Sequence, residues 1–250
     1  MSDQDKTVGD ETDLGEADYV ERQITAGTNL VLRGKQESLA GPLFAINWFD
    51  TKPAWVYHFY NFLAGSRLTK AGGRALFKAR VVKSLSGDEA LARQFLLIVN
   101  YPAAENFLNL ASDRFFLLIS VLRMISVRRF SFVMHQRLDD QANTKGLKSY
   151  AVVHFSASEP SASVNALRDS TSAHNVQIGF TGQRAVTAAT QGKDGETAMP
   201  YVTDNTVLLM AESDTQLQEY FSGPDFQRFV SSTDNHYAGL LRPLLRAENE

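Results

Sequence analysis

An unusually aromatic segment with a histidine in its middle is the first place where this sequence could do chemistry. Six of the eight residues in the segment 55–62 carry aromatic rings if His58 is counted. On a helix, Tyr57, His58 and Asn61 lie toward one face. Another face is shared by Trp55, Phe59 and Phe62. Histidine titrates near neutral pH, so we predict proton transfer by His58, with Tyr57 as a second candidate catalytic residue. The alternative is a core helix with His58 at its wet edge.

Residues in two apolar strands are candidates for lining a ligand cavity. Asn47 lies inside the apolar run 42–49, where its amide must find a partner or face a cavity. Trp48 lies on the opposite face of that strand, and His154 stands at the equivalent position in the second half of the chain. We therefore take Asn47, Trp48, Asn61 and His154 as candidate ligand-binding residues. The alternatives are a structural hydrogen bond for Asn47 and ordinary packing for His154.

Two arginines follow similar glycine motifs. Arg74 comes after Gly73, and Arg184 stands at the matching position of a second Gly-containing segment. A symmetric pair of arginines can clamp a carboxylate, so Arg74 joins the candidate ligand-binding residues. The alternative is a solvated surface arginine in each copy.

Motifs for metal, nucleotide or triad chemistry are absent from the sequence. It has no HExxH, EF-hand, GxGxxG or P-loop pattern, and its five histidines are scattered. We predict no metal site and no cofactor. Haem stays open as an alternative, because haem ligation needs only one axial histidine.

The elements that must position these residues repeat along the chain. The segment 72–79 returns 110 residues later as 182–189, and 45–49 superimposes on 151–155 at an offset of 106. Each copy is predicted to run strand, helix, strand, strand, helix, strand. This order is the ferredoxin-like βαββαβ arrangement, an antiparallel sheet with helices on one face. We therefore expect an α+β protein with two tandem ferredoxin-like domains, packed sheet against sheet as an internal pseudo-dimer.

Domain boundaries follow from composition. We predict repeat 1 at 41–138, a polar linker at 139–146 and repeat 2 at 147–246. Residues 1–22 carry eight acids against two bases and few apolar groups, which predicts an acidic flexible tail. The rest of the chain is close to neutral, so nucleic acid is not expected as a partner. The chain has no cysteine, no apolar run of transmembrane length and no signal-peptide pattern, so we expect a cytoplasmic protein.

The segment 115–129 is apolar nearly all round. Five arginines and no acid occur between Arg114 and Leu138. Such a helix is expected to be covered on more than one side, by the second domain or by another subunit in a homo-oligomer. The alternative is an interfacial membrane helix with arginines at its polar edge.

The order of motifs in the first copy resembles the dimeric α/β-barrel superfamily, in particular its small uncharacterised bacterial members. The matching residues are Asn47, Tyr57 or Tyr60, Gly72-Gly73, Tyr101-Pro102-Ala103, Phe107-Leu108 and Ser112-Asp113. The second copy keeps Gly182, Leu217, Ser222-Gly223-Pro224 and Phe226 but lacks the Asn and the Tyr-Pro. The resemblance covers roughly residues 42–246 and implies that any site lies in the first copy.

The resemblance leaves several functions open, because the superfamily includes cofactor-free monooxygenases, isomerases, dehydratases, haem proteins such as chlorite dismutases, and plain ligand binders. We expect a protein that binds a small apolar or aromatic ligand in repeat 1, either as a binder or as a cofactor-independent enzyme of monooxygenase, isomerase or lyase type. One alternative is a non-catalytic interaction or scaffolding module, peripheral to a membrane through the 115–129 helix. Another is a haem protein of chlorite-dismutase type.

Overall fold

A computed structural model describes residues 19–24, 29–138, 147–192 and 195–246. The predicted linker 139–146 and residues 1–18 of the predicted tail lie outside the described residues. Residues 19–22, the end of that predicted tail, instead begin strand β1 (Tyr19–Ile24). Strand β1 pairs antiparallel with β2 (Leu30–Lys35), an element that the sequence analysis missed.

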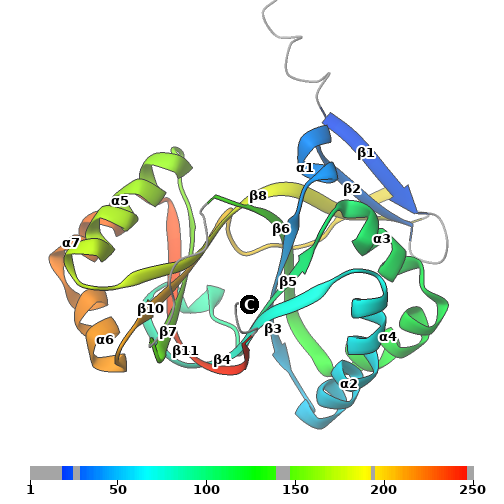
Figure 1. Ribbon diagram of the computed structural model, residues 1–250, viewed down its shortest axis with the longest axis horizontal. Coiled ribbons are helices and arrows are strands. Elements are labelled where there is room, and N and C mark those ends of the chain that lie inside the picture. The colour runs from blue at the N-terminus through cyan, green and yellow to red at the C-terminus, as the bar shows by residue number, and fades with distance from the viewer. Residues whose placement is uncertain (1–18, 25–28, 139–146, 193–194, 247–250) are drawn as a thin grey trace, which may run out of the picture.

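Eight antiparallel strands close into a barrel at the centre of the molecule (Figure 1). Around the barrel they follow the order β8, β10, β7, β11, β4, β5, β3, β6, and β6 returns to β8. Their bounds are β3 (Leu43–Thr51), β4 (Arg74–Gly87), β5 (Phe95–Tyr101), β6 (Val127–Arg137), β7 (Ser149–Ser156), β8 (Gln177–Gly192), β10 (Asn205–Ala211) and β11 (Asn235–Arg246). The expectation of two separate sheets packed face to face was therefore wrong. Pairing of β4 with β11 and of β6 with β8 joins the two halves into one sheet, which removes the free edges.

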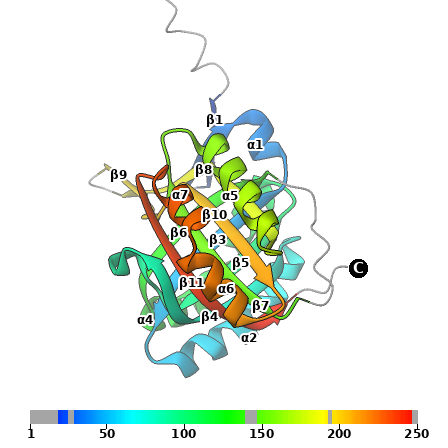
Figure 2. The ribbon, with the colours of Figure 1, turned by 90° about the vertical axis from the view of Figure 1, so that its left-hand side faces the viewer.

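Helices cover the barrel on two opposite sides (Figure 1). The helices α2 (Ala54–Lys70), α3 (Ala104–Ser112) and α4 (Arg114–Ser126) lie against the strands of the first half. The helices α5 (Pro160–Ala173), α6 (Asp214–Ser222) and α7 (Pro224–Val230) lie against the strands of the second half, and Figure 2 faces this side. Each strand therefore has one face toward the barrel interior and one toward helices.

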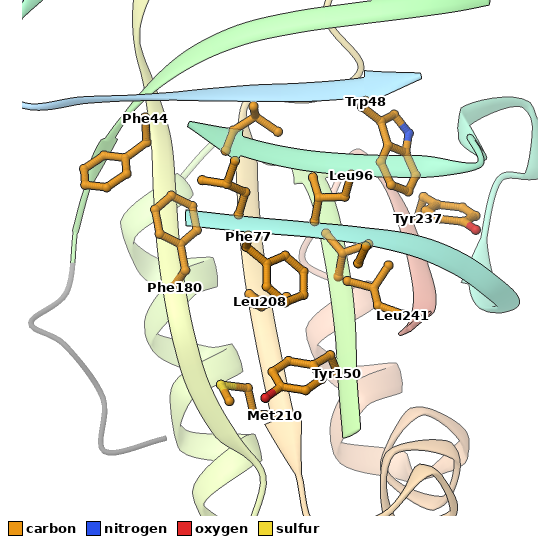
Figure 3. Packing of buried hydrophobic residues seen from close by; sticks show 14 of the residues in the cluster. Phe44, Trp48, Phe77, Leu96, Tyr150, Phe180, Leu208, Met210, Tyr237 and Leu241 are labelled. Carbon is orange, nitrogen blue, oxygen red and sulfur yellow. The ribbon is translucent and has the colours of Figure 1, made fainter. Parts of the chain in front are cut away.

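The barrel interior is a packed apolar core built from both halves (Figure 3). Phe44 and Trp48 point inward from β3, where Phe44 meets Phe180 of β8 and Trp48 meets Tyr237 of β11. The Trp48 indole nitrogen donates to the carbonyl of Leu91 at 2.8 Å, so its one polar atom is satisfied. Because side chains alternate along a strand, Asn47 points outward toward the helices.

The shorter elements extend the structure around β8. Strand β2 pairs with the second half of β8, and β9 (Gly195–Ala198) pairs with its end. The short helix α1 (Gln36–Ala40) follows β2, and a 3₁₀ turn at Glu89–Leu91 precedes β5.

Local signals explain where the helices over the first half begin. Pro53 is the N-cap of α2, a position where its missing N–H removes no hydrogen bond of the helix. The Asp113 side chain accepts from the Phe116 amide at 2.7 Å and so caps α4. Gly72 adopts a φ of 81° between α2 and β4, a conformation that glycine reaches without strain.

The pairing of strands in the two halves agrees with the sequence repeat at some positions and not at others. Ala45 pairs with Val99, and Ala151 pairs with Leu209, which are the equivalences that the repeat predicts. The glycine motifs do not follow this register, because Arg74 lies opposite Asn100 of β5 whereas Arg184 lies opposite His135 of β6. Arg74 and Arg184 are therefore not structurally equivalent, and the predicted symmetric clamp is not formed.

Candidate functional site: a cavity beneath helices α2 and α4

A cavity of about 900 Å³ lies between the outer face of the first-half strands and the helices α2, α3 and α4. Its volume is within the range of ligand-binding pockets in proteins. Most of its lining is apolar or aromatic, and none of the described lining residues is an aspartate or a glutamate. The aromatic part of the wall comes from Phe49, Tyr57, Tyr60, Tyr101, Phe107, Phe116, Phe130 and Phe132.

The aromatic wall is held together by ring contacts between α2, β3 and α4. The Tyr57 ring lies 4.9 Å from Phe49 and 6.0 Å from Tyr60, measured between centroids. Tyr60 in turn lies 6.3 Å from Phe116 of α4. Tyr57 and Tyr60 are both buried, so α2 presents these two rings to the sheet.

Burial raises the pKa of Tyr57, Tyr60 and Tyr101 above the usual range of a phenol. The positive charge of Arg123 opposes this effect on the pKa of all three phenols. The three phenols therefore stay protonated at neutral pH. Tyr57 can donate a hydrogen bond to a ligand but is not a base in this state.

Two cations also line the cavity. Lys78 projects from the outer face of β4, and its Nζ lies 4.8 Å from the centroid of the Tyr57 ring. Burial lowers the pKa of Lys78 to about 8. Arg123 of α4 lies over the Phe130 ring at 5.4 Å, and its Nε is buried without a hydrogen-bond partner.

Two asparagine amides contribute the other polar groups. Asn47 donates through Nδ2 to the carbonyls of Ala45 and Leu97, each at 3.3 Å, so its amide has structural partners as well as a place on the cavity wall. The Nδ2 of Asn61 is buried with no hydrogen-bond partner. Asn61 lies near the Tyr57 hydroxyl and lowers the pKa of that phenol, against the larger effect of burial.

The structure brings together four of the residues selected from the sequence and separates the other three. Asn47, Tyr57, His58 and Asn61 all line the cavity, with His58 exposed at its rim. Trp48 and His154 lie in the barrel interior, with ring centroids 4.6 Å apart, and do not reach the cavity. Arg74 is exposed at the start of β4 and is not part of the lining.

Lys78 and Arg123 also line the cavity but were not among the residues predicted from the sequence. A signal existed for each of them. Lys78 alternates with Phe77 and Ala79, which point into the barrel, so it had to point outward. Arg123 is the lone cation in the otherwise apolar stretch 115–127.

A second polar group of residues is buried inside the barrel. His154 Nδ1 lies 3.0 Å from the hydroxyl of Thr206, while both ring nitrogens of His135 lack a partner. Burial lowers the pKa of each histidine to about 3, so both rings are neutral near pH 7. Within the described residues, no three His, Cys, Asp or Glu side chains gather to hold a metal ion.

The outer side of helices α2 and α4 is an exposed apolar surface, which we call the α2/α4 face. Its members are Trp55, Phe59 and Phe62 of α2 and Phe115, Leu118, Val121, Met124 and Ile125 of α4. The two helices pack against one another at the lower right of Figure 1. Helix α4 is buried on one side only, where Ile119 and Ser120 pack inward. Its other side is exposed, so the expectation that the second half of this chain covers the helix was wrong.

Comparisons with known proteins establish the fold. No protein-family model matches the sequence, and no curated protein matches it. An anthrone oxidase-like protein of known structure matches with a TM-score of 0.50 and 10% identity, covering 87% of this chain and 100% of its own. A mutant chlorite dismutase from Candidatus Nitrospira defluvii matches with a TM-score of 0.49 and 9% identity, over 83% and 95% of the two chains. A protein of unknown function from Rhodopseudomonas palustris is 18% identical over 40% of this chain and 85% of its own, with a TM-score of 0.39.

The fold defined by the barrel and its two helical layers is that of the dimeric α/β-barrel proteins, so the resemblance predicted from the sequence is confirmed. At these identities the likeness concerns the fold alone and not the site. No helix in the described part of the chain is long and apolar enough to cross a membrane.

The described cavity lining contains a histidine side chain that could be an axial ligand of a haem. Among the described lining residues His58 is the one histidine, and it is exposed at the rim. The buried lining atoms that lack partners are Asn61 Nδ2 and Arg123 Nε. Both are nitrogens of N–H donor groups, which bind oxygen atoms of a ligand and do not coordinate iron.

Proposed function

We propose that this protein binds a small apolar or aromatic molecule in the cavity beneath α2 and α4. The observation that carries the proposal is the cavity of about 900 Å³, lined largely by aromatic rings and by a few polar groups. Rings such as Tyr57 and Phe116 would contact a flat or hydrophobic ligand, and the phenols and amides would orient it.

The same cavity supports a cofactor-independent reaction. His58 lies at the rim, and histidine is the side chain that most often transfers protons in enzymes, so it is the candidate to accept or deliver a proton. Tyr57 remains protonated and would donate a hydrogen bond to an oxygen atom of the ligand. A monooxygenase, isomerase or lyase could each use this pair of groups.

Native mass spectrometry of the purified protein, followed by ligand titration, tests the proposal. Asn47→Leu and His58→Phe keep much of the side-chain volume while removing polar groups from the wall. Asn100→Leu is the control, because Asn100 lies on the neighbouring strand β5 outside the cavity lining. Weaker binding in the first two variants, with unchanged thermal stability, supports the site. Binding that is equal in all three variants contradicts roles for Asn47 and His58, and a protein that binds no apolar compound contradicts the function. A Soret band in the purified protein would instead support the haem alternative.

We infer that the chain is a tandem fusion of two ferredoxin-like units. Both halves have the strand order second, third, first, fourth, as β4-β5-β3-β6 and as β8-β10-β7-β11. The equivalent pairs Ala45–Val99 and Ala151–Leu209 support a common ancestral register.

The chain contains no cysteine and needs no oxidising compartment, so we propose that the protein is cytoplasmic.

A second candidate function is docking on an anionic membrane surface through the α2/α4 face. Trp55 and Phe62 are 71% and 80% exposed, and Leu118 and Met124 are 69% and 71% exposed. Neither helix contains an acid, whereas α2 has Arg67 and Lys70 in its last turn and α4 begins at Arg114. A symmetric dimer through this face would bring like charges together, so the charge pattern favours anionic lipid over a second copy.

Vesicle co-sedimentation and size-exclusion chromatography with light scattering separate these partners. We expect binding to vesicles that contain phosphatidylserine and weaker binding to phosphatidylcholine alone. Phe62→Ser should reduce vesicle binding, whereas Val82→Ser on β4, also exposed, should not. A stable dimer that Phe62→Ser dissociates would instead support the homo-oligomer expected from the sequence.

A further inference from the structure

The cavity has a positive charge that no residue in its lining balances. Lys78 and Arg123 both line it, and the described lining contains no carboxylate. Buried charges in proteins are ordinarily paired, because an unpaired ion loses its hydration without compensation. An exposed cation needs no partner, but these two side chains are partly withdrawn from solvent.

Both cations lie over rings of one aromatic cluster. The ammonium of Lys78 lies 4.8 Å from the Tyr57 centroid, and the guanidinium of Arg123 lies 5.4 Å from the Phe130 centroid. Both rings neighbour Phe49, at centroid distances of 4.9 Å and 6.5 Å. The positive groups therefore converge on one part of the wall, from strand β4 on one side and helix α4 on the other. The remaining wall, including Phe107, Leu110 and Phe132, is apolar.

Unpartnered N–H groups lie at the same place. The Nδ2 of Asn61 and the Nε of Arg123 are buried and make no hydrogen bond within the described residues. Asn61 lies one helical turn after Tyr57 on α2, so its amide belongs to the same part of the wall. Leaving such donors without an acceptor is costly, and an acceptor from a ligand would remove that cost.

From this arrangement we propose that the ligand is an acid with an apolar body, whose carboxylate or phenolate oxygen atoms bind between Lys78, Arg123 and Asn61. The inference rests on the proposed function, since it names the chemical class of molecule that occupies the same cavity. Cation charge and N–H donors then recognise the head group, and the aromatic wall contacts the apolar body.

Matched acids and neutral analogues test this proposal by isothermal titration calorimetry. We would titrate 2-naphthoate and decanoate, and beside them methyl 2-naphthoate and decanol at matched concentrations. The acids should bind at least roughly tenfold more tightly than the neutral analogues, because a hydrogen bond to a charged group is worth more than one to a neutral group. If acids and neutral analogues bind equally well, this inference is wrong while the proposed function stands. If none of the four binds, the proposed function itself is contradicted for these ligands.

Charge-removing variants locate the head group. Lys78→Met and Arg123→Met should each weaken binding of the acids roughly tenfold or more and leave binding of the neutral analogues nearly unchanged. Lys70→Met is the matched control, because Lys70 is an exposed lysine in the last turn of α2 and lies outside the lining. A preference for acids that survives both cavity variants would place the head group elsewhere and overturn the assignment. Thermal unfolding of each variant shows whether a loss of ligand binding is caused by misfolding.

Discussion

The ammonium group of Lys78 lies 4.8 Å from the centroid of the Tyr57 ring, on the wall of an apolar cavity. This contact joins strand β4 to helix α2 and gives the lysine an aromatic face in place of a carboxylate. Cation–π attraction compensates in part for the loss of hydration of the ammonium. The pKa of Lys78, lowered to about 8, shows that burial still disfavours its charged form.

Replacing Lys78 by methionine should therefore stabilise the ligand-free protein. We expect a gain of about 1–2 kcal/mol in the free energy of unfolding at pH 7, less than the whole pKa shift implies because the side chain is partly exposed. Between pH 8 and pH 10.5 the unfolded wild type binds more protons than the folded wild type, so wild-type stability increases with pH. The difference in free energy of unfolding between the variant and wild type should therefore shrink over this range. Urea unfolding of wild type and variant at pH 7 and pH 9.5 measures both effects.

Lys70→Met serves as the control for this series, since Lys70 is exposed and should change stability by less than about 0.5 kcal/mol. A Lys78→Met protein that is less stable than wild type at pH 7 would mean that the Tyr57 contact outweighs the cost of burial.

Acid should destabilise the barrel through its two buried histidines. Their folded pKa values of about 3 lie below the ordinary value of 6.5, so the unfolded state binds more protons between pH 6.5 and pH 3. Stability is therefore lost as the pH falls through this window. Each histidine should cost about 2.5 kcal/mol between pH 7 and pH 4.5.

His135→Leu removes one of these groups together with two unpartnered ring nitrogens. Its acid-unfolding midpoint should lie at lower pH than that of wild type, as followed by circular dichroism. His174→Leu is the comparison, because that ring is partly exposed and pairs with Asp225 at 2.9 Å. An unchanged midpoint in His135→Leu would show that other groups control acid unfolding.

The sequence predicted the strands and helices well where hydrophobic periodicity was strong. Apolar runs such as 94–101 and 206–211 match β5 and β10 within one residue. The sequence of residues 84–89 predicts a turn, which is wrong, since β4 continues to Gly87 and pairs with β11, a partner more than 140 residues away in the chain. The sequence also predicts a helix over 225–237, but α7 ends at Val230, because β11 begins at Asn235 and closes the barrel.

The candidate site was predictable only as far as side-chain alternation determines it. Strand alternation correctly placed Asn47 and Trp48 on opposite faces, but which face holds the cavity depends on closure of the barrel. His154 follows Trp48 into the interior for the same reason. The desolvation of Lys78 and Arg123 depends on the distance between β4 and α4, which no local pattern encodes.

Two glycines should respond in opposite ways to alanine. At Gly182 in β8 an added Cβ would lie 2.7 Å from His135 Nδ1 and 2.7 Å from Phe180, inside the packed barrel. Gly182→Ala should therefore destabilise the protein by about 1–3 kcal/mol through overpacking. At Gly65 in α2 a Cβ meets nothing within 4 Å, so Gly65→Ala should stabilise by about 0.5–1 kcal/mol through helix propensity. Thermal unfolding of both variants measures these changes. Equal effects of the two substitutions would contradict close packing around Gly182.

Adjacent residues on α4 provide the sharpest test of which side of this helix is covered. Leu118 is 69% exposed, whereas Ile119 is 5% exposed and packs with Phe49 and Tyr57. Ile119→Glu would bury an unpaired carboxylate and should cost about 3 kcal/mol or more, enough to unfold a marginal domain. Leu118→Glu should leave the free energy of unfolding within about 0.5 kcal/mol of wild type, because its carboxylate remains in water.

The same Leu118 variant should lose binding to phosphatidylserine vesicles if the α2/α4 face docks on anionic lipid, since it adds a negative charge to an apolar and basic surface. Urea unfolding and vesicle co-sedimentation of the two variants therefore show whether the α2/α4 face binds lipid or is buried in a contact between subunits. If Leu118→Glu is as unstable as Ile119→Glu, or if it changes the molecular mass in solution, a protein partner covers the face instead.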